Sequence, residues 1–467
     1  MTRNVKYLMA FILFMLLLPG SSYSQSYTTE TVINFGFNHG GTSFEFLPGN
    51  KIIVSDQDTS VRVYDLNGNF ISTFWDFKDS VLLGGESGIL GICLDPSFSV
   101  NHFVYIYYTS KIDTTLRIVR LTENNDVGTN PLQIFRHFRQ GGIHVGGYMC
   151  FGPQYKLFVL IGNNSFQSNS QLLNNPYGKI LRLNPNGSIP LDNPFYDDGN
   201  PLTGNDDRIW VYGLRNGYGM YINPFNDSLY QSENGSVNKD EINFISKGRN
   251  YGFPHCEGYC SPYNPSFKQP MMVIDETVML PSYAPTGLVI YNGSQFPEWI
   301  GKLLVIGISP NDQFTGLIKG ELGNMPFADT ISSWSVILPG ITGTCMKQGI
   351  DGHIYVLTYS PAALYRIIRD LSGINGNHEN IGYTLSQNYP NPFNPVTSIK
   401  YEIPQNGFVT LKIFNVLGME ISTLVNQTKR QGTHEVTWSA SDFPGGVYFY
   451  ELNVDGFSER KKMVLIK

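Results

Sequence analysis

The chain has 467 residues, more than one ordinary domain needs, although closed β architectures reach such lengths. Charged residues make up 15% and aromatic residues 13%, and 48 glycines accompany many asparagines and prolines, a composition that favours strands and turns over helices. The net charge of −6 provides no basic footprint, which argues against nucleic-acid binding.

The N-terminal segment predicts export. Arg3 and Lys6 precede the apolar run LMAFILFMLLLP, and a small-residue stretch that ends in SYS follows it. This order is typical of a signal peptide. A membrane anchor is the alternative, but the run is short, since a spanning helix needs about 20 apolar residues. We therefore expect a signal peptide over residues 1–24, and no later segment is long and apolar enough to cross a membrane.

One local pattern recurs along residues 44–358: an apolar stretch, a turn with Pro, Gly or Asp, and a β-rich stretch. Its six instances are FEFLPGNKIIVSD, ICLDPSFSVNHFVYIYY, MCFGPQYKLFVLIG, MYINPFNDSLYQSE, LVIYNGSQFPEWIGKLLVIG and MKQGIDGHIYVLT. Each predicts a strand, a hairpin turn and a second strand. Six such units without a convincing amphipathic helix between them predict an all-β fold, a β-propeller. A stack of β-sandwiches is the alternative, but it would not repeat one hairpin pattern so often.

The segment YGLRNGYG, residues 212–219, stands just before the fourth unit. Its glycines let the backbone approach a ligand closely, and Arg215 would present a planar, permanently charged group. Propellers bind ligands at the mouth of their central channel, on loops between and within blades. The segment is therefore a candidate channel loop.

The five cysteines permit disulfides but form no disulfide framework. Cys256 and Cys260 are the only close pair and could staple a loop. A metal site with His255 is the alternative, weakened because no second ligand pair follows. The remaining three lie in apolar strand-like runs typical of buried free thiols: Cys93, Cys150 and Cys345.

The chain changes character after Asp370. The stretch LSGINGNHEN, residues 371–380, is polar and rich in Gly and Asn, as linkers are. From residue 381 to residue 467, strand-like runs alternate with turn residues, which fits a small β-sandwich. We expect one propeller over residues 25–370 and a separate C-terminal domain over residues 381–467.

Six motifs over residues 35–368 resemble, in order, the glucose/sorbosone dehydrogenase family: GGESGILGICLDPSF, HVGGYMCFGP, GKILRLNPNGSIPLDNPF, IWVYGLRNGYG, DEINFISKGRNYGFPHCEG and DGHIYVLT. Each motif alone is weak, but their shared order is specific. The resemblance implies a six-bladed β-propeller and a quinoprotein oxidoreductase, which uses PQQ and Ca²⁺ to oxidise a sugar or related alcohol. Electrons would pass to an external acceptor.

The C-terminal segment resembles the sorting domain of type IX secretion. The likeness rests on NYPNPFNP, NVLGMEI, DFPGGVYFYEL and the basic end KKMVLIK. It implies contact with the type IX secretion machinery, passage through the periplasm, and a secreted or cell-surface destination. A carbohydrate-binding sandwich is the alternative, but the Pro/Asn-rich opening and the short basic end favour a sorting domain.

The resemblance also assigns site residues. It implies that His144 is the catalytic base, which takes the proton of the sugar's anomeric hydroxyl. Arg215 and Asn216 would bind the quinone, with Glu86 and Asn234 near the cofactor. Without the resemblance, Arg215 could merely brace adjacent loops and His144 could be an ordinary histidine in a turn.

The same resemblance implies two calcium sites. Gly235 and Ser236 would provide main-chain oxygens to a Ca²⁺ beside the quinone. Glu241 and Tyr251 match a second, structural calcium site of some members. The alternative for such carboxylates is simple solvation.

Three departures count against activity. The fifth-blade loop GISPNDQF lacks the lysine of active members, Thr342 and Thr344 stand at two arginine positions, and Val145 replaces an Asn or Gln. PQQ carries three carboxylates, and each lost charge-assisted bond is worth about 1.5–3 kcal/mol. A non-catalytic propeller that binds a glycan or protein at the cell surface is therefore the alternative function. A hydrolase is weaker, since the chain has neither GxSxG nor HExxH.

Overall fold

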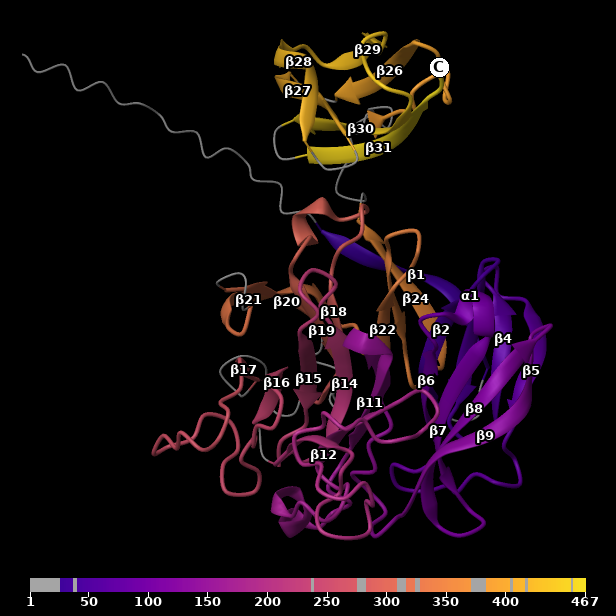
Figure 1. Cartoon of the computed structure of the whole chain (residues 1–467), viewed down its shortest axis with the longest axis vertical. Coiled ribbons are helices and arrows are strands. Elements are labelled where there is room, and N and C mark those ends of the chain that lie inside the picture. Colours follow the sequence, from indigo (N-terminus) through magenta and orange to yellow (C-terminus); the bar gives the residue numbers. More distant parts are fainter. Residues whose placement is uncertain are drawn as a thin grey trace, which may run out of the picture.

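The computed structural model describes most of the chain, with strands as its main elements (Figure 1). The described residues are 26–36, 40–236, 239–274, 283–308, 316–323, 328–370, 384–403, 406–415, 419–454 and 457–467. The expected signal peptide, residues 1–24, and the expected linker, residues 371–380, lie outside them.

Up to Arg369 the described strands form six four-stranded antiparallel sheets, numbered here in chain order. Sheet 1 contains β2 (Gly41–Leu47), β3 (Lys51–Asp56), β4 (Ser60–Asp65) and β5 (Phe70–Asp76). Sheet 2 contains β6 (Ile89–Leu94), β7 (Phe103–Ser110), β8 (Thr115–Asn124) and β9 (Val127–Phe138). Sheet 3 contains β10 (Met149–Gly152), β11 (Lys156–Ile161), β12 (Lys179–Leu183) and β13 (Ile209–Tyr212).

The other three sheets repeat this arrangement. Sheet 4 contains β14 (Gly217–Ile222), β15 (Leu229–Glu233), β16 (Asp240–Ile245) and β17 (Met272–Ile274). Sheet 5 contains β18 (Pro285–Ile290), β19 (Leu303–Gly307), β20 (Gly316–Leu322) and β21 (Ile331–Pro339). Sheet 6 contains β22 (Cys345–Gln348), β23 (Ile354–Leu357), β24 (Ala363–Arg369) and β1 (Tyr27–Asn34).

Helical structure among the described residues is limited to four short turns: α1 (Phe98–Asn101), η1 (Pro153–Tyr155), η2 (Gln167–Gln171) and η3 (Pro297–Trp299). The six repeated segments of the sequence each form the first two strands of one sheet, paired antiparallel. The all-β prediction and the six predicted hairpins are therefore confirmed.

Burial explains the apolar second strand of each repeat. In β19 and β23 every residue is buried, whereas β5 and β21, the fourth strands of their sheets, are largely exposed. A strand covered on both faces reads as a continuous apolar run. The second strands are therefore interior elements that neighbouring sheets cover on both faces.

Six apolar clusters join the six sheets in a closed cycle. Each cluster combines buried residues of two consecutive sheets, and one of them joins sheet 6 back to sheet 1. In that closing cluster Ile33 and Leu357 pack with Phe44, Ile52 and Val54. Burial of apolar surface between neighbouring sheets is the main favourable contribution to the stability of this arrangement.

Sheet 6 is the only one of the six built from both ends of the region. Strand β1 pairs with β24, in a register that runs from Tyr27 opposite Arg369 to Asn34 opposite Ala363. The sequence analysis did not predict this strand. Its pairing fastens the two ends of the region to each other.

The cysteine predictions are partly resolved. Cys256 and Cys260 form a disulfide, with their Cα atoms 5.4 Å apart. Cys93 and Cys345 are free and buried, as predicted, and Cys150 is free but only partly buried. The disulfide leaves no thiolates at these two positions for the alternative metal site.

Two further sheets occupy the C-terminal part. One contains β25 (Thr384–Leu385), β26 (Val396–Ile403) and β29 (Gly432–Ser439); the other contains β28 (Glu420–Lys429), β27 (Gly407–Phe414), β30 (Gly446–Val454) and β31 (Phe457–Leu465). Residues of both sheets, including Tyr401, Leu411, Trp438 and Tyr450, share one apolar cluster. Within the described part of the chain, no helix is long and apolar enough to cross a membrane.

Replacement of Ile33 by alanine tests whether β1 closes the ring. Ile33 is 2% exposed in the closing cluster, so I33A should lower the free energy of unfolding by about 2–5 kcal/mol, measured by urea denaturation. Glu30, on the same strand, forms an exposed ion pair with Arg366, and E30Q should cost less than about 1 kcal/mol. Equal stability of the two variants would contradict the role of β1.

Candidate functional site

One cavity is lined by residues of all six sheets or of the loops next to them. It has a volume of about 260 Å³ and is bounded by Thr42, Gln57, Gly85, Glu86, Leu90, Gly146, Tyr148, Tyr218, Thr286, Ile308, Thr344 and Tyr359. Glu86 is the only charged residue among these lining residues. A central, partly apolar cavity with a few convergent polar groups is the usual form of a small-molecule site.

Two larger hollows are weaker candidates. One, of about 690 Å³, lies beside β1, β2 and β3, and the other, of about 720 Å³, is lined mainly by residues 254–267. The residues that line them include none of the site residues predicted from the sequence. The smaller central cavity contains Glu86, which contacts two of those residues.

Glu86 connects His144 with Asn216. The backbone N–H of His144 donates to Glu86 Oε2 at 2.7 Å, and Asn216 Nδ2 lies 3.4 Å from both carboxylate oxygens. The three residues precede β6, β10 and β14, which are the first strands of three consecutive sheets. The structure thus brings together three of the predicted site residues, from three sheets.

Hydrogen bonds indicate which ring nitrogen of His144 carries the proton. Its Nδ1 lies 2.8 Å from Asn163 Oδ1, and that same oxygen accepts the backbone N–H of Ser165 at 3.0 Å. Because Asn163 offers an acceptor, Nδ1 carries the proton and Nε2 keeps a free lone pair. Burial lowers the pKa of His144 below its usual value of 6.5, so the neutral, proton-accepting form predominates at neutral pH.

The backbone at His144 is also fixed. Its φ of 57° lies in the left-handed region, which is uncommon for a residue other than glycine. Its carbonyl accepts hydrogen bonds from the backbone N–H and the side-chain amide of Asn164, at 3.0 and 3.1 Å. A Cβ atom at Gly162 would lie 2.4 Å from this carbonyl oxygen, so only glycine permits the close approach.

Arg215 is held by its neighbours along the adjacent strand. Its backbone N–H donates to Glu233, as does that of Asn216 at 2.6 Å, and its Nη1 donates to the backbone oxygen of Asn234 at 2.7 Å. The contact with Asn234 braces the loop, which is the alternative role that the sequence analysis gave for Arg215. The side-chain oxygens of Asn216 and Asn234, however, are buried without a hydrogen-bond partner among the described residues.

A buried acidic pair lies behind Arg215. Glu233 and Glu241 face each other across β15 and β16 and line a small cavity with Gly235 and Tyr251. Burial raises the pKa of Glu233 to about 7; burial and the nearby Glu233 raise the pKa of Glu241 to about 8. Buried carboxyl groups whose pKa is raised to this extent hold protons near neutral pH or bind a cation.

The residues predicted as calcium ligands are only partly brought together. Gly235, Glu241 and Tyr251 line the small cavity, but Ser236 donates through its N–H and its hydroxyl to Glu257. The Tyr251 hydroxyl donates to the Phe244 carbonyl at 2.7 Å and is therefore occupied. Among the four predicted ligands, only Glu241 brings a carboxylate to this cavity, which Glu233 and Glu257 also line.

The positions that depart from the family lack cationic side chains. Thr344 lines the central cavity, and its hydroxyl lies 2.8 Å from the Gly41 carbonyl oxygen and 3.1 Å from that of Leu357. Val145 is buried, and its carbonyl accepts the Tyr107 hydroxyl at 2.8 Å. Of the loop GISPNDQF, which lacks the lysine, residues 309–314 lie outside the described residues.

The sequence analysis missed three residues of this site. Asn163 orients the His144 ring, Glu233 anchors the Arg215–Asn216 backbone, and Tyr218 lines the central cavity. Burial, with the charge of Glu86 second, raises the pKa of Tyr218. Glu233 directly precedes Asn234, and Tyr218 lies within YGLRNGYG. Their position next to predicted site residues is the sequence feature that could have identified both.

Two regions of the chain match known protein families. The glucose/sorbosone dehydrogenase family matches residues 39–366, and the secretion system C-terminal sorting domain matches residues 387–467. The first range covers the six sheets except β1 and the end of β24, and the second covers the two C-terminal sheets except β25.

Individual relatives agree with the first match. An uncharacterized protein of Synechocystis is 32% identical over 340 residues, which is 67% of this chain and 80% of the relative. The aldose sugar dehydrogenase of Escherichia coli is 30% identical over 289 residues, which is 59% of this chain and 75% of the relative. Among solved structures, the PQQ-bound aldose sugar dehydrogenase of Streptomyces coelicolor superposes with a TM-score of 0.61 at 24% identity, covering 74% of this chain and 98% of that one. This last similarity establishes the fold alone.

The acidic pair predicts a pH-dependent stability. Both carboxyls hold protons in the folded protein that the unfolded chain releases above its usual pKa of 4.5. Their contribution is complete below that pH and is lost as the pH rises through about 7 and 8. The free energy of unfolding, measured with a chelator present, should therefore fall between pH 5.5 and 8.5 less steeply in E241Q than in wild type.

The exposed Glu30 provides the matched control for this measurement. E30Q removes a carboxyl outside the pair and should show the wild-type dependence on pH. Parallel stability curves for E241Q and wild type would show that Glu241 does not hold the proton.

Proposed function

Because the chain belongs to the glucose/sorbosone dehydrogenase family, we propose that it is an exported quinoprotein-type oxidoreductase of sugars or related alcohols. The observation that carries this proposal is the contact of Glu86 with both His144 and Asn216, beside a cavity lined from all six sheets. The aldose sugar dehydrogenase of E. coli supports the substrate class, and the PQQ-bound Streptomyces structure supports the cofactor.

For the architecture, we infer that the six sheets are the blades of one closed six-bladed β-propeller over residues 25–370. The closed cycle of six apolar clusters and the pairing of β1 with β24 support it. We infer that the two C-terminal sheets form the β-sandwich of a sorting domain over residues 381–467, which their shared apolar cluster supports.

The donor chemistry of the site fits PQQ. Arg215 provides a planar cation for a quinone or carboxylate oxygen. Asn216 and Asn234 add side-chain amides, and their buried, unpartnered oxygens suit a ligand N–H or a Ca²⁺ ion. Together with Glu86, these residues would hold the cofactor. When bound, PQQ supplies an ortho-quinone that accepts the two electrons and the hydrogen removed from the alcohol carbon.

His144 would act as the base of the reaction. The hydrogen bond to Asn163 leaves the Nε2 lone pair free to accept the substrate's hydroxyl proton. The resulting imidazolium would be stabilised by the charge of Glu86, which favours the protonated form. Burial keeps this base neutral before the reaction, so no proton has to leave it first.

Calcium binding stays a prediction at both places. Beside the cofactor, Gly235 and Ser236 would provide main-chain oxygens. At the second place Glu241 and Tyr251 line a small cavity with Glu233, and this buried acidic pair supports a cation there.

A non-catalytic propeller that binds a glycan or protein at the cell surface is the second candidate. It is favoured by one observation: Glu86 is the only charged residue that lines the described central cavity. The hydroxyl of Thr344, where active members carry an arginine, already contacts main-chain oxygens. Such a wall would also suit the neutral hydroxyl groups of a glycan.

For the route of the protein, we propose export by the signal peptide to the periplasm and then by the type IX secretion machinery, to the cell surface or the medium. The match of residues 387–467 with a C-terminal sorting domain supports this route. At that location an external acceptor would take the electrons from the reduced cofactor.

Reconstitution tests the oxidoreductase. Purified protein mixed with PQQ and Ca²⁺ should show the absorption of a bound quinone, which aldoses should bleach. Because burial lowers the pKa of His144, the acid limb of the rate–pH profile should lie below pH 6.5. Absence of binding at micromolar PQQ would remove the enzyme hypothesis in favour of the second candidate.

Two variants separate chemistry from binding in this experiment. H144Q should lower turnover by about 10²–10⁴-fold and leave PQQ affinity nearly unchanged, because a base contributes mainly to proton transfer. R215A should instead weaken PQQ binding. The exposed His102 provides a control, and H102Q should behave as wild type. Wild-type rates in H144Q would exclude it as the base.

Deletion of residues 381–467 tests the sorting role. The two C-terminal sheets have their own apolar cluster, so the truncated protein should keep a folded ring that still binds its ligand. In its natural host it should accumulate in the periplasm, as measured by cell fractionation. Removal of only the basic end, residues 461–467, should have the same effect. Normal surface levels of the truncated protein would favour a carbohydrate-binding domain instead.

A further inference from the structure

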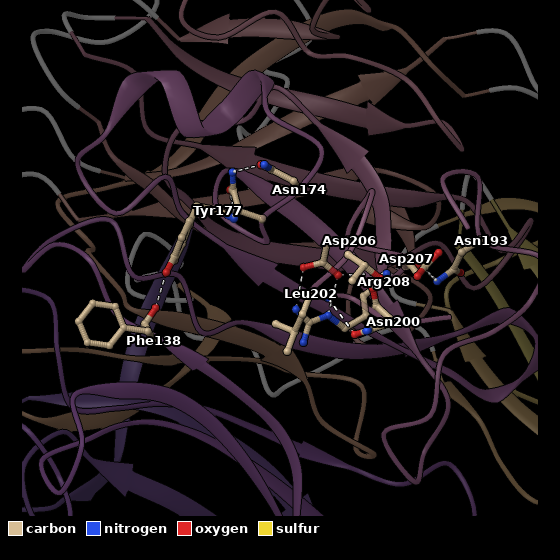
Figure 2. Close-up of polar contacts among 11 residues, drawn as sticks. Phe138, Asn174, Tyr177, Asn193, Asn200, Leu202, Asp206, Asp207 and Arg208 are labelled. Atoms are coloured by element: carbon tan, nitrogen blue, oxygen red, sulfur yellow. Dashed lines mark hydrogen bonds and ion pairs between the residues drawn. The ribbon is translucent and has the colours of Figure 1, made fainter. Parts of the chain in front are cut away.

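The loop between β12 and β13 carries an acidic cluster away from the central cavity. Its segment DDGNPLTGNDD, residues 197–207, brings Asp197, Asp198 and Asp207 together, and one carboxylate oxygen of each lies within 4.8 Å of the others. Figure 2 shows the buried end of this loop, where the Asn193 side chain donates to the Asp207 backbone oxygen at 2.9 Å.

Asp207 supplies an independent reason to expect a ligand. Its side chain is completely buried, and its Oδ1 accepts the backbone N–H of Asp197 at 2.5 Å. Its Oδ2 is also buried but has no hydrogen-bond partner among the described residues. A buried carboxylate oxygen without a donor or cation is strongly unfavourable, so this atom lacks a partner that the folded protein requires.

The neighbouring Asp206, in contrast, has a hydrogen-bond donor for each of its carboxylate oxygens. It is as buried as Asp207, but Arg208 donates to both of its oxygens, through Nε at 2.7 Å and Nη2 at 2.6 Å (Figure 2). The arginine that follows this pair of aspartates thus neutralises Asp206 and leaves Asp207 without a counter-charge from the described residues.

The exposed aspartates are oriented by the loop itself. Asp198 accepts the Asn200 N–H at 2.7 Å, and Asp197 accepts the Asn205 N–H at 2.8 Å. A Cβ atom at Gly204, whose φ is +58°, would lie 2.5 Å from Asp197 Oδ2, so the backbone packs directly on this carboxylate. These contacts hold both carboxylates near Asp207 and leave them open to water.

We propose that Asp197, Asp198 and Asp207 bind one Ca²⁺ ion. Ca²⁺ binds oxygen ligands at about 2.3–2.6 Å, so two ligands of one ion lie up to about 5 Å apart, and the three oxygens already satisfy this limit. The cluster contains only oxygen donors, which disfavours zinc. Water completes the coordination sphere on the exposed side, an arrangement that Ca²⁺ tolerates because its geometry is flexible.

The ion fastens the loop to the start of β13. Asp197 and Asp198 come from the middle of the loop, whereas Asp207 stands two residues before Ile209, the first residue of β13. Three residues beyond the end of that strand lies Arg215. The site is on a different loop from the calcium positions discussed above, and its role is to order the strand that leads into the candidate active site.

Calcium titration of the metal-free full-length protein, without PQQ, tests the proposal. Wild type should melt at a higher temperature with saturating CaCl₂ than with EDTA, and calorimetry should count the bound ions. D198N should bind one ion fewer, or bind it with a Kd raised by about tenfold or more, because charge count sets affinity. The exposed Asp79 is the matched control, and D79N should behave as wild type. E241Q should retain this ion.

The stability of D207N relative to wild type should depend on whether calcium is present. Without calcium it should be at least as stable as wild type, because the uncompensated buried charge is gone. With saturating calcium it should be less stable than wild type, because the ion is lost. Identical calcium stoichiometry and Kd in wild type and D198N would overturn the proposal, as would a calcium response that E241Q alone abolishes. Neither result depends on PQQ binding or turnover.

Discussion

Closure of the ring is the constraint on which the rest of the structure depends. Each of the six sheets has two faces to bury, and each buries them against its two neighbours, so the series is stable only if the last sheet meets the first. The pairing of β1 with β24 and the apolar cluster around Ile33 and Phe44 provide that meeting. Since every sheet packs against two neighbours, displacement of one sheet would expose apolar surface on both of them.

The candidate site is a consequence of this closure. Glu86, His144 and Asn216 precede the first strands of three consecutive sheets, and they meet because the cycle brings those strands to one cavity. The ring also excludes water, which lowers the pKa of His144 and raises those of Glu233 and Glu241. The same burial therefore gives a neutral base and an acidic pair, and Asn216 contacts Glu233 of that pair through its N–H and Glu86 through its side chain.

Three of the ten buried side-chain atoms without a hydrogen-bond partner among the described residues lie where we propose ligands. The side-chain oxygens of Asn216 and Asn234 lie beside the candidate site, and Oδ2 of Asp207 lies in the loop before β13. An unpaired buried polar group destabilises the folded state, and a bound ligand or ion that pairs with it removes this destabilisation. The first two fit a cofactor or its metal, and the third fits a structural cation, so one physical criterion serves both proposals.

The sequence by itself determined the all-β class, the six hairpins and the family, because apolar runs and turn residues are local patterns that survive without tertiary context. It also supplied His144, Arg215 and Glu86 through motif resemblance, although their roles remain proposals. It could not show β1, whose partner β24 lies more than 300 residues away, nor the opposition of Glu233 to Glu241, which depends on strand register. Whether a carboxylate is paired, as in Asp206, or orphaned, as in Asp207, was decided only by tertiary structure, because burial and the reach of Arg208 are properties of the folded chain.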